Sequence, residues 1–232
     1  MMPVPQLTTA LLIVVLTAQA GNGSVHAAFD AYVRALGGEA ALRGVGTRTT
    51  EGRFDNGRGL RAPFRILEKA PNKRVTIIGS EPVSSDEGSG RGYDGRAGWD
   101  RNFIGTGLRA VEGDELQDLS READLLRALN LEADCSSPQV EETASTTVVR
   151  CRFGHGRAAT LHFDRNSHLL ARQDLQLDAQ RTVSSFFDDY RDVEGVKVPF
   201  RVRFVAPGAD ATYTVERVRV NETIADRLFQ RP

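Results

Sequence analysis

Regular alternation of apolar and polar side chains runs along most of this chain and limits what it can fold into. Residues 60–66 read LRAPFRI and residues 196–204 read VKVPFRVRF, so every second side chain is apolar in both segments. Successive side chains of a β-strand point to opposite faces of the sheet, so this pattern predicts strands with one apolar and one polar face. Few segments have helical spacing, which leaves a large apolar face with little to cover it. Such a face is typical of a binding site.

Turn signals divide the pattern into consecutive strands. The predicted strands are residues 48–54, 60–68, 73–78, 91–93, 97–101, 146–153, 158–164, 168–177, 183–192, 196–205 and 211–220. Asn56-Gly57, Asp94-Gly95 and Glu194-Gly195 are turn-forming pairs between such segments, which indicates hairpins and antiparallel neighbours. No repeat or low-complexity linker interrupts the chain, so we expect one domain of about ten or eleven strands.

Helical spacing occurs in two places, with a short turn after the first. Residues 25–36 carry apolar side chains at helical spacing before Gly37-Gly38, and residues 39–43 add a turn. Residues 112–131 predict one amphipathic helix whose first turn is acidic. Its apolar stripe consists of Leu116, Leu119, Ala123, Leu126 and Leu129. We expect this helix to pack on the sheet and to act as a lid.

The N-terminus predicts export. Residues 10–16 (ALLIVVL) are apolar but too short to span a bilayer, and Ala18-Gln19-Ala20 is a small-x-small cleavage pattern. No Lys or Arg precedes the apolar run, so only the amino terminus supplies positive charge there. We expect residues 1–20 to be a signal peptide and residues 21–232 to form the mature periplasmic domain. The alternative is an uncleaved amphiphilic tail; a lipid anchor is disfavoured because no Cys follows the run.

Two cysteines, Cys135 and Cys151, fit an exported protein because disulfides persist in oxidising compartments. A bond between them would close a loop of about 15 residues and contribute on the order of 3 kcal/mol. Cys151 shares a strand face with Val149 and Phe153, so it is expected to point inward. The alternative is two buried free thiols, and two cysteines without a nearby His make a poor metal site.

Charge and motifs argue against several function classes. The 30 basic and 31 acidic residues give a net charge of −1, unlike a protein that binds nucleic acid. GxSxG, HExxH and paired-Cys zinc motifs are absent, and the glycines within residues 88–92 lack the helix that a dinucleotide site needs. His162 and His168 flank one hairpin, and only Asp164 is near enough to be a third metal ligand. We therefore expect both histidines to be solvated strand residues rather than metal ligands. We predict no enzyme, no cofactor and no metal.

Several turn and strand motifs together point to a known group. These motifs are Ala35-Leu36-Gly37-Gly38, Lys69-Ala70-Pro71-Asn72-Lys73, Tyr93-Asp94-Gly95 through Gly98-Trp99, Asp189-Tyr190, and Val193-x-Gly195-Val196-Lys197-x-Pro199. Over residues 25–229 the chain resembles the LolA/LolB-like superfamily of outer-membrane lipoprotein-sorting proteins, and more closely its exported relatives. The resemblance implies a mainly β (α+β) fold, an incomplete antiparallel β-barrel over a hydrophobic cavity with helices as its lid. In the lipoprotein carriers of that group the cavity holds acyl chains.

We therefore predict a non-enzymatic periplasmic carrier of lipid or of lipoprotein acyl chains. Each buried CH2 would contribute about 0.8 kcal/mol, so a few suffice for useful affinity. We expect a monomer without a transmembrane segment after signal cleavage, whose partners are a lipid or acylated protein and an envelope protein. The alternative is an exported protein–protein interaction module with a filled core, binding through its outer face or residues 80–90. A hydrolase is a third class of function that the sequence leaves open.

The predicted ligand contacts come from the apolar faces of the strands and of the central helix. The predicted cavity wall is Phe54, Phe64, Ile66, Val75, Ile77, Trp99, Phe200, Val202 and Phe204, and the predicted lid face is Leu116, Leu119 and Leu126. Many of these side chains would be core in any sheet protein. For Trp99 in particular, the alternative is a hairpin with one core aromatic residue.

Overall fold

One continuous antiparallel sheet contains most of the described chain. The computed structural model describes residues 22–79, 89–101, 107–154 and 156–231. Within them, thirteen strands follow the order β6-β5-β4-β3-β2-β1-β13-β12-β11-β10-β9-β8-β7. Every neighbouring pair is antiparallel. The predicted signal peptide and most of the loop at 80–90 lie outside the described residues.

The strands are β1 (Thr47–Asp55), β2 (Arg61–Lys69), β3 (Lys73–Ile78), β4 (Ser89–Tyr93), β5 (Gly98–Arg101), β6 (Leu108–Val111), β7 (Cys135–Glu142), β8 (Thr146–Phe153), β9 (Arg157–Asp164), β10 (Leu170–Gln176), β11 (Thr182–Val193), β12 (Val196–Ala206) and β13 (Ala209–Val220). The helices are α1 (Asn22–Ala35), α2 (Glu39–Arg43), α3 (Gly113–Glu122), α4 (Arg127–Asp134) and the 3-10 helix η1 (Asp226–Phe229).

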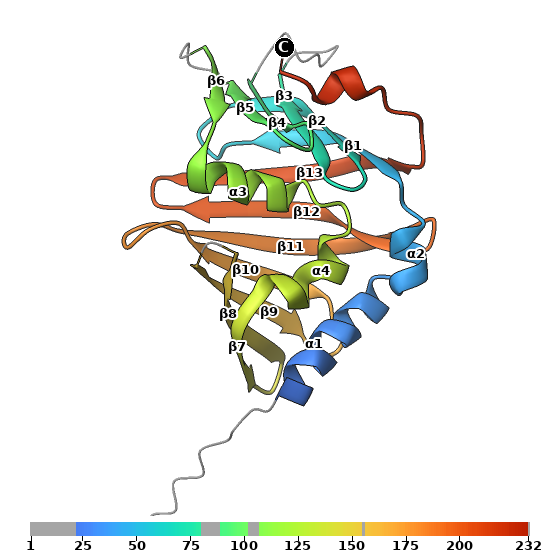
Figure 1. Cartoon of the computed structure of the whole chain (residues 1–232), viewed down its shortest axis with the longest axis vertical. Helices are drawn as coiled ribbons and strands as arrows, with labels where there is room; N and C mark the ends of the chain where they lie inside the picture. Colours follow the sequence, from blue (N-terminus) through green and yellow to red (C-terminus); the bar gives the residue numbers. More distant parts are fainter. Residues whose placement is uncertain (1–21, 80–88, 102–106, 155, 232) are drawn as a thin grey trace, which may run out of the picture.

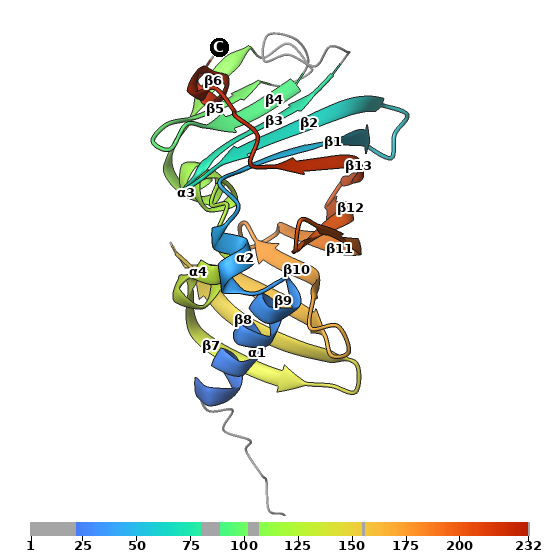
Figure 2. The same cartoon turned by 90° about the vertical axis from the view of Figure 1, so that its right-hand side faces the viewer.

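The chain reaches the two edges of the sheet in turn. Strands β1 to β6 follow one another to the first edge, and α3 and α4 then cross the sheet to the opposite edge (Figure 1). Strands β7 to β13 lead back from that edge, so that β13 pairs with β1. Helices α1, α3 and α4 lie over the same face of the sheet, and the turned view shows the sheet curving around them (Figure 2). The predicted fold class, a mainly β incomplete barrel with helices over its concave face, is confirmed.

We call the face under these helices the inner face and the opposite one the outer face. Register connects the inner face across the sheet, since Leu161 pairs with Gln173, Gln173 with Ser185, and Ser185 with Phe204. The inner face of β7–β10 packs against α1 and α4 around Leu161. The inner face of β4–β6 packs against α3. The helices therefore cover the two ends of the sheet more than its middle strands.

The two edge strands and a helix break differ from the sequence prediction. Strands β6 and β7 were not predicted, because β6 has four residues and β7 (CSSPQVEE) contains a proline and no alternation. Residues 112–131 form two helices rather than one. The backbone amide of Leu125 donates to the carbonyl of Pro71, and that of Leu126 donates to the Asp124 carboxylate. These bonds hold residues 123–126 outside both helices.

The predicted disulfide is confirmed: Cys135 and Cys151 are bonded, with their Cα atoms 5.4 Å apart. Cys135 begins β7 and Cys151 lies in β8, and both are buried in the α1 cluster. The bond therefore attaches an edge strand, which has only one hydrogen-bonding neighbour, to the core of the sheet.

The outer face carries a second apolar cluster under the C-terminal segment. Leu67, Val75, Ile77 and Trp99 pack there with Ile224 and Phe229 around η1. The Trp99 indole nitrogen donates to the carbonyl of Phe229 at 3.2 Å. Its ring lies over Gly90 and Gly92, where a Cβ would come within 3.3 and 2.5 Å of it. Close approach to a tryptophan ring thus explains these two glycines.

We predict that Gly92→Ala lowers the free energy of unfolding by about 1–3 kcal/mol, because the added methyl group overpacks the Trp99 ring. Gly90→Ala is the matched control, since its Cβ would meet the same ring at 3.3 Å rather than 2.5 Å. Urea denaturation followed by the fluorescence of the single tryptophan measures both. Equal losses for the two variants would contradict this packing.

Candidate hydrophobic binding face

Apolar side chains fill the middle of the inner face, where β1, β2, β12 and β13 meet. The buried members of this cluster, which we call the inner cluster, are Phe54, Phe64, Ile78, Val198, Phe200 and Val215. Gly52 allows Phe64 to lie across β1, because a Cβ at Gly52 would be 2.9 Å from the Phe64 ring. The strand alternation thus builds an apolar surface from segments far apart in the chain.

An aromatic group forms one end of the inner cluster. The Tyr213 ring centroid lies 5.0 Å from those of Phe54 and Phe64 and 5.6 Å from that of Phe204, all in edge-on arrangements. Burial raises the pKa of the Tyr213 phenol to about 12, so it stays neutral at physiological pH. Phe204 is 37% exposed and is the exposed large hydrophobic side chain of the described residues. The apolar surface therefore reaches solvent at Phe204.

Six of the nine predicted wall residues share the inner face. Phe54, Phe64 and Phe200 are buried in the inner cluster, and Ile66 packs against it. Val202 pairs with Tyr213 across β12 and β13, and Phe204 pairs with Ala211, so both point to the same side. Sequence alternation placed these six correctly on one face.

The other three wall residues, Val75, Ile77 and Trp99, lie on the outer face. They pack with Phe229 beneath the C-terminal segment, on the far side of the sheet from Phe64. Strand β3 ends in Ile77 and Ile78, both buried, so it is apolar on both faces. Alternation alone could not tell which of the two faces inward, and the inner residue is Ile78.

The predicted lid residues are also divided. Leu116 and Leu119 of α3 pack on Tyr93 and Val111 of the inner face, together with Ala123. Leu126 lies in the break between α3 and α4 rather than on the same helical stripe. The lid contact with this end of the sheet is therefore made by α3 alone.

Tyr213, Ile78 and Val215 were missed as members of the inner face. Residues 211–215 read ATYTV, so the alternation that marks Tyr213 and Val215 was present in the sequence. What was lacking was the pairing of β1 with β13, which sets Phe54 opposite Tyr213. That pairing joins the first strand to the last.

A buried ion group lies at the other end of the same face. Glu68 is 3% exposed and accepts from Arg48 Nε at 2.6 Å and from Arg74 Nη1 at 2.5 Å. Burial alone would raise the pKa of Glu68, but the two guanidinium groups outweigh it and lower the pKa from 4.5 to about 2. One carboxylate between two arginines leaves one net positive charge here.

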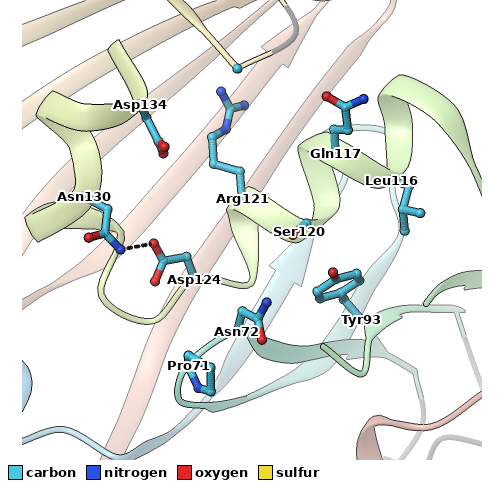
Figure 3. Close-up of a pocket in the computed structure, with 11 residues that line it drawn as sticks. Pro71, Asn72, Tyr93, Leu116, Gln117, Ser120, Arg121, Asp124, Asn130 and Asp134 are labelled. Carbon is cyan, nitrogen blue, oxygen red and sulfur yellow. Dashed lines mark hydrogen bonds between the residues drawn. The ribbon is translucent and has the colours of Figure 1, made fainter. Parts of the chain in front are cut away.

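A polar pocket of about 570 Å³ lies where α3, α4 and the β2–β3 turn meet (Figure 3). Arg121 and Ser120 of α3, Asn130 and Asp134 of α4, and Asn72 of the turn contribute polar side chains. Tyr93 and Leu116 also line it, and both belong to the contact between α3 and the sheet. The pocket therefore adjoins the lid.

The described residues contain no group of three or more His, Cys, Asp or Glu that could hold a metal ion. His162 pairs instead with Asp174, with Nε2 and Oδ2 3.1 Å apart. None of the described helices is both long and apolar enough to cross a bilayer.

Comparison with solved structures identifies the fold. A LolA superfamily protein from Nitrosomonas europaea matches with a TM-score of 0.53 and 13% identity, covering 79% of this chain and 89% of that one. A domain from Vibrio parahaemolyticus, classed as an outer-membrane lipoprotein-sorting protein, matches with a TM-score of 0.57 and 10% identity, covering 82% and 92%. No protein-family model and no curated protein sequence matches the chain. The chain has a LolA-like fold.

We predict that Glu68→Gln lowers the free energy of unfolding at pH 7 by roughly 3–5 kcal/mol, because it leaves two buried guanidinium groups without their carboxylate. The pKa of Glu68 is lower in the folded than in the unfolded chain. Its stabilisation is therefore complete above pH 4.5 and is lost as the pH falls toward 2.

Urea denaturation between pH 7 and pH 2.5 measures this dependence. Glu216→Gln is the control, because Glu216 pairs with Arg53 on an exposed part of the sheet. Identical pH dependence in Glu68→Gln and the wild type would contradict the assignment.

Proposed function

We propose that this protein is a non-enzymatic carrier that binds the acyl chain of a lipid or lipoprotein on its inner face. The observation that supports it most is the aromatic group around Tyr213, which continues the inner cluster outward to the exposed Phe204. An acyl chain against these rings would remove apolar area from water, at about 0.8 kcal/mol per buried CH2. The LolA-like fold supports the same proposal.

We further propose that the chain is exported to the periplasm as one mature domain. The apolar run at residues 10–16 with the small residues that follow it supports a signal peptide. The disulfide between Cys135 and Cys151 supports an oxidising compartment. A lipid or an acylated envelope protein would be its partner there.

The alternative is an interaction module with a filled core. One observation favours it: Phe64 and Phe200 are only 2% and 8% exposed, so the described side chains fill much of the inner cluster themselves. A chain inserted between them would have to rearrange these rings. Bound ligand distinguishes the two functions.

Native mass spectrometry of protein purified from a periplasm, followed by extraction of bound molecules, tests the proposal. We expect a co-purifying lipid or acylated peptide, or uptake of added lipid by the apo protein. An apo mass that persists with excess lipid would overturn the carrier function and favour the interaction module.

We predict that Phe204→Asp weakens binding of a fluorescent fatty-acid probe by at least tenfold, because a carboxylate would replace the exposed ring of the inner face. Phe186→Asp is the matched control. Phe186 pairs with Arg172 and Arg203, which places it on the outer face of β11. Equal loss of probe binding in both folded variants would exclude the inner face as the site.

A further inference from the structure

The pocket beside the lid holds two opposite charges that do not pair with each other. Arg121 projects from α3 and Asp134 from α4, and Figure 3 shows both at the same side of the pocket. They are near enough for the charge of Arg121 to act on Asp134, yet the described structure contains no ion pair between them. The pocket therefore presents an arginine and an unpaired carboxylate to a ligand, beside the already hydrogen-bonded carboxylate of Asp124.

Arg121 lacks an acceptor for part of its guanidinium. Its guanidinium carbon lies 4.2 Å from the centroid of the Phe153 ring, and its Nη2 is 3.3 Å from Asp118 Oδ1. Arg157 Nε is 2.7 Å from the other oxygen of Asp118, so that carboxylate is shared. The Nη1 atom of Arg121 is buried with no hydrogen-bond partner among the described residues. The shared Asp118 carboxylate therefore leaves the Arg121 guanidinium incompletely paired within the described residues.

Asp134 likewise lacks a donor. Its carboxylate makes no hydrogen bond or ion pair with the described residues, and burial raises its pKa although Arg121 and Arg127 act in the opposite direction. The neighbouring carboxylate of Asp124 is satisfied, because it accepts from the Leu126 amide at 2.9 Å and from Asn130 Nδ2 at 2.7 Å. Of these two acids, Asp134 is the one available to a ligand.

We propose that this pocket binds the zwitterionic head group of the carried lipid, a phosphate bonded to Arg121 and a primary ammonium bonded to Asp134. The inference rests on the proposed carrier function and names its ligand class, a phosphoethanolamine lipid. An anionic head group would satisfy Arg121 but would face Asp134 without compensation, and a cationic head group would do the reverse. Amide and hydroxyl groups of Asn72, Gln117 and Ser120 supply hydrogen bonds around such a head group.

The size and place of the pocket agree with a head group attached to a chain. Its volume of about 570 Å³ lies within the range of small-molecule sites and exceeds what the phosphoethanolamine group alone needs. Leu116 and Tyr93 connect the pocket to the apolar contact of α3 with the sheet. A glycerol backbone at these side chains would direct its acyl chains toward the inner face.

Calorimetric titration of the purified full-length mature protein with three probes tests the assignment. The probes are dihexanoyl phosphatidylethanolamine, dihexanoyl phosphatidylglycerol with the same chains, and chain-free glycerophosphoethanolamine. We expect the wild type to bind the ethanolamine lipid about tenfold more tightly than the glycerol lipid. Asp134→Asn should lower the affinity for phosphatidylethanolamine about tenfold. It should leave the affinity for phosphatidylglycerol unchanged or raise it.

Glu132→Gln is the matched control, because Glu132 lies on the same helix but pairs with His26 away from the pocket. It should leave both affinities unchanged, and thermal unfolding confirms that each variant is folded. Equal binding of both lipids, insensitive to Asp134→Asn, would overturn the head-group site while leaving the carrier function standing. Binding of glycerophosphoethanolamine but of neither lipid would support the head-group site and overturn the carrier function. Binding of none of the three probes would overturn both.

Discussion

The pairing of β1 with β13 is the interaction on which the rest of this structure depends. Two meanders, β1–β6 and β7–β13, would be separate sheets without it, and it sets Phe54 opposite Tyr213. Only then do Phe64 from one meander and Phe200 from the other meet in one inner cluster. These contacts join residues some 150 positions apart, so forming them costs loop-closure entropy. Burial of the apolar side chains, rather than local structure, offsets that cost.

The inner face is chemically divided along its length. Aromatic rings gather at the end of β12 and β13 that bears Phe204, whereas Glu68 and its two arginines lie toward the helices. Arg121 and Asp134 add a second polar region where α3 meets α4. An amphiphile has the same division, with an apolar chain and a polar head, and the proposed ligand is of that kind.

Alternation in the sequence predicted the strands and the side of most inner residues, because a half-buried sheet enforces a period of two. It failed where that condition is not met. Strand β3 is apolar on both faces, so Ile77 was assigned inward in place of Ile78, and Trp99 was not expected beneath the C-terminal segment. The break between α3 and α4 depends on hydrogen bonds to Pro71 and Asp124, which no periodicity records. The polar pocket was missed for the same reason, since its residues come from separate elements.

The disulfide has a consequence for motion of the lid. Helix α4 ends at Asp134, and the next residue, Cys135, is bonded to the core strand β8. Helix α4 also packs against α1 through Leu131 and Ala128. Helix α4 is thereby anchored at its end and along its side. Helix α3 is held separately, by the packing of Leu116 and Leu119 on the sheet and by the ion pair between Asp118 and Arg157 of β9. The two sides of the polar pocket are therefore held by different contacts, so a small shift between α3 and α4 would change the space between Arg121 and Asp134.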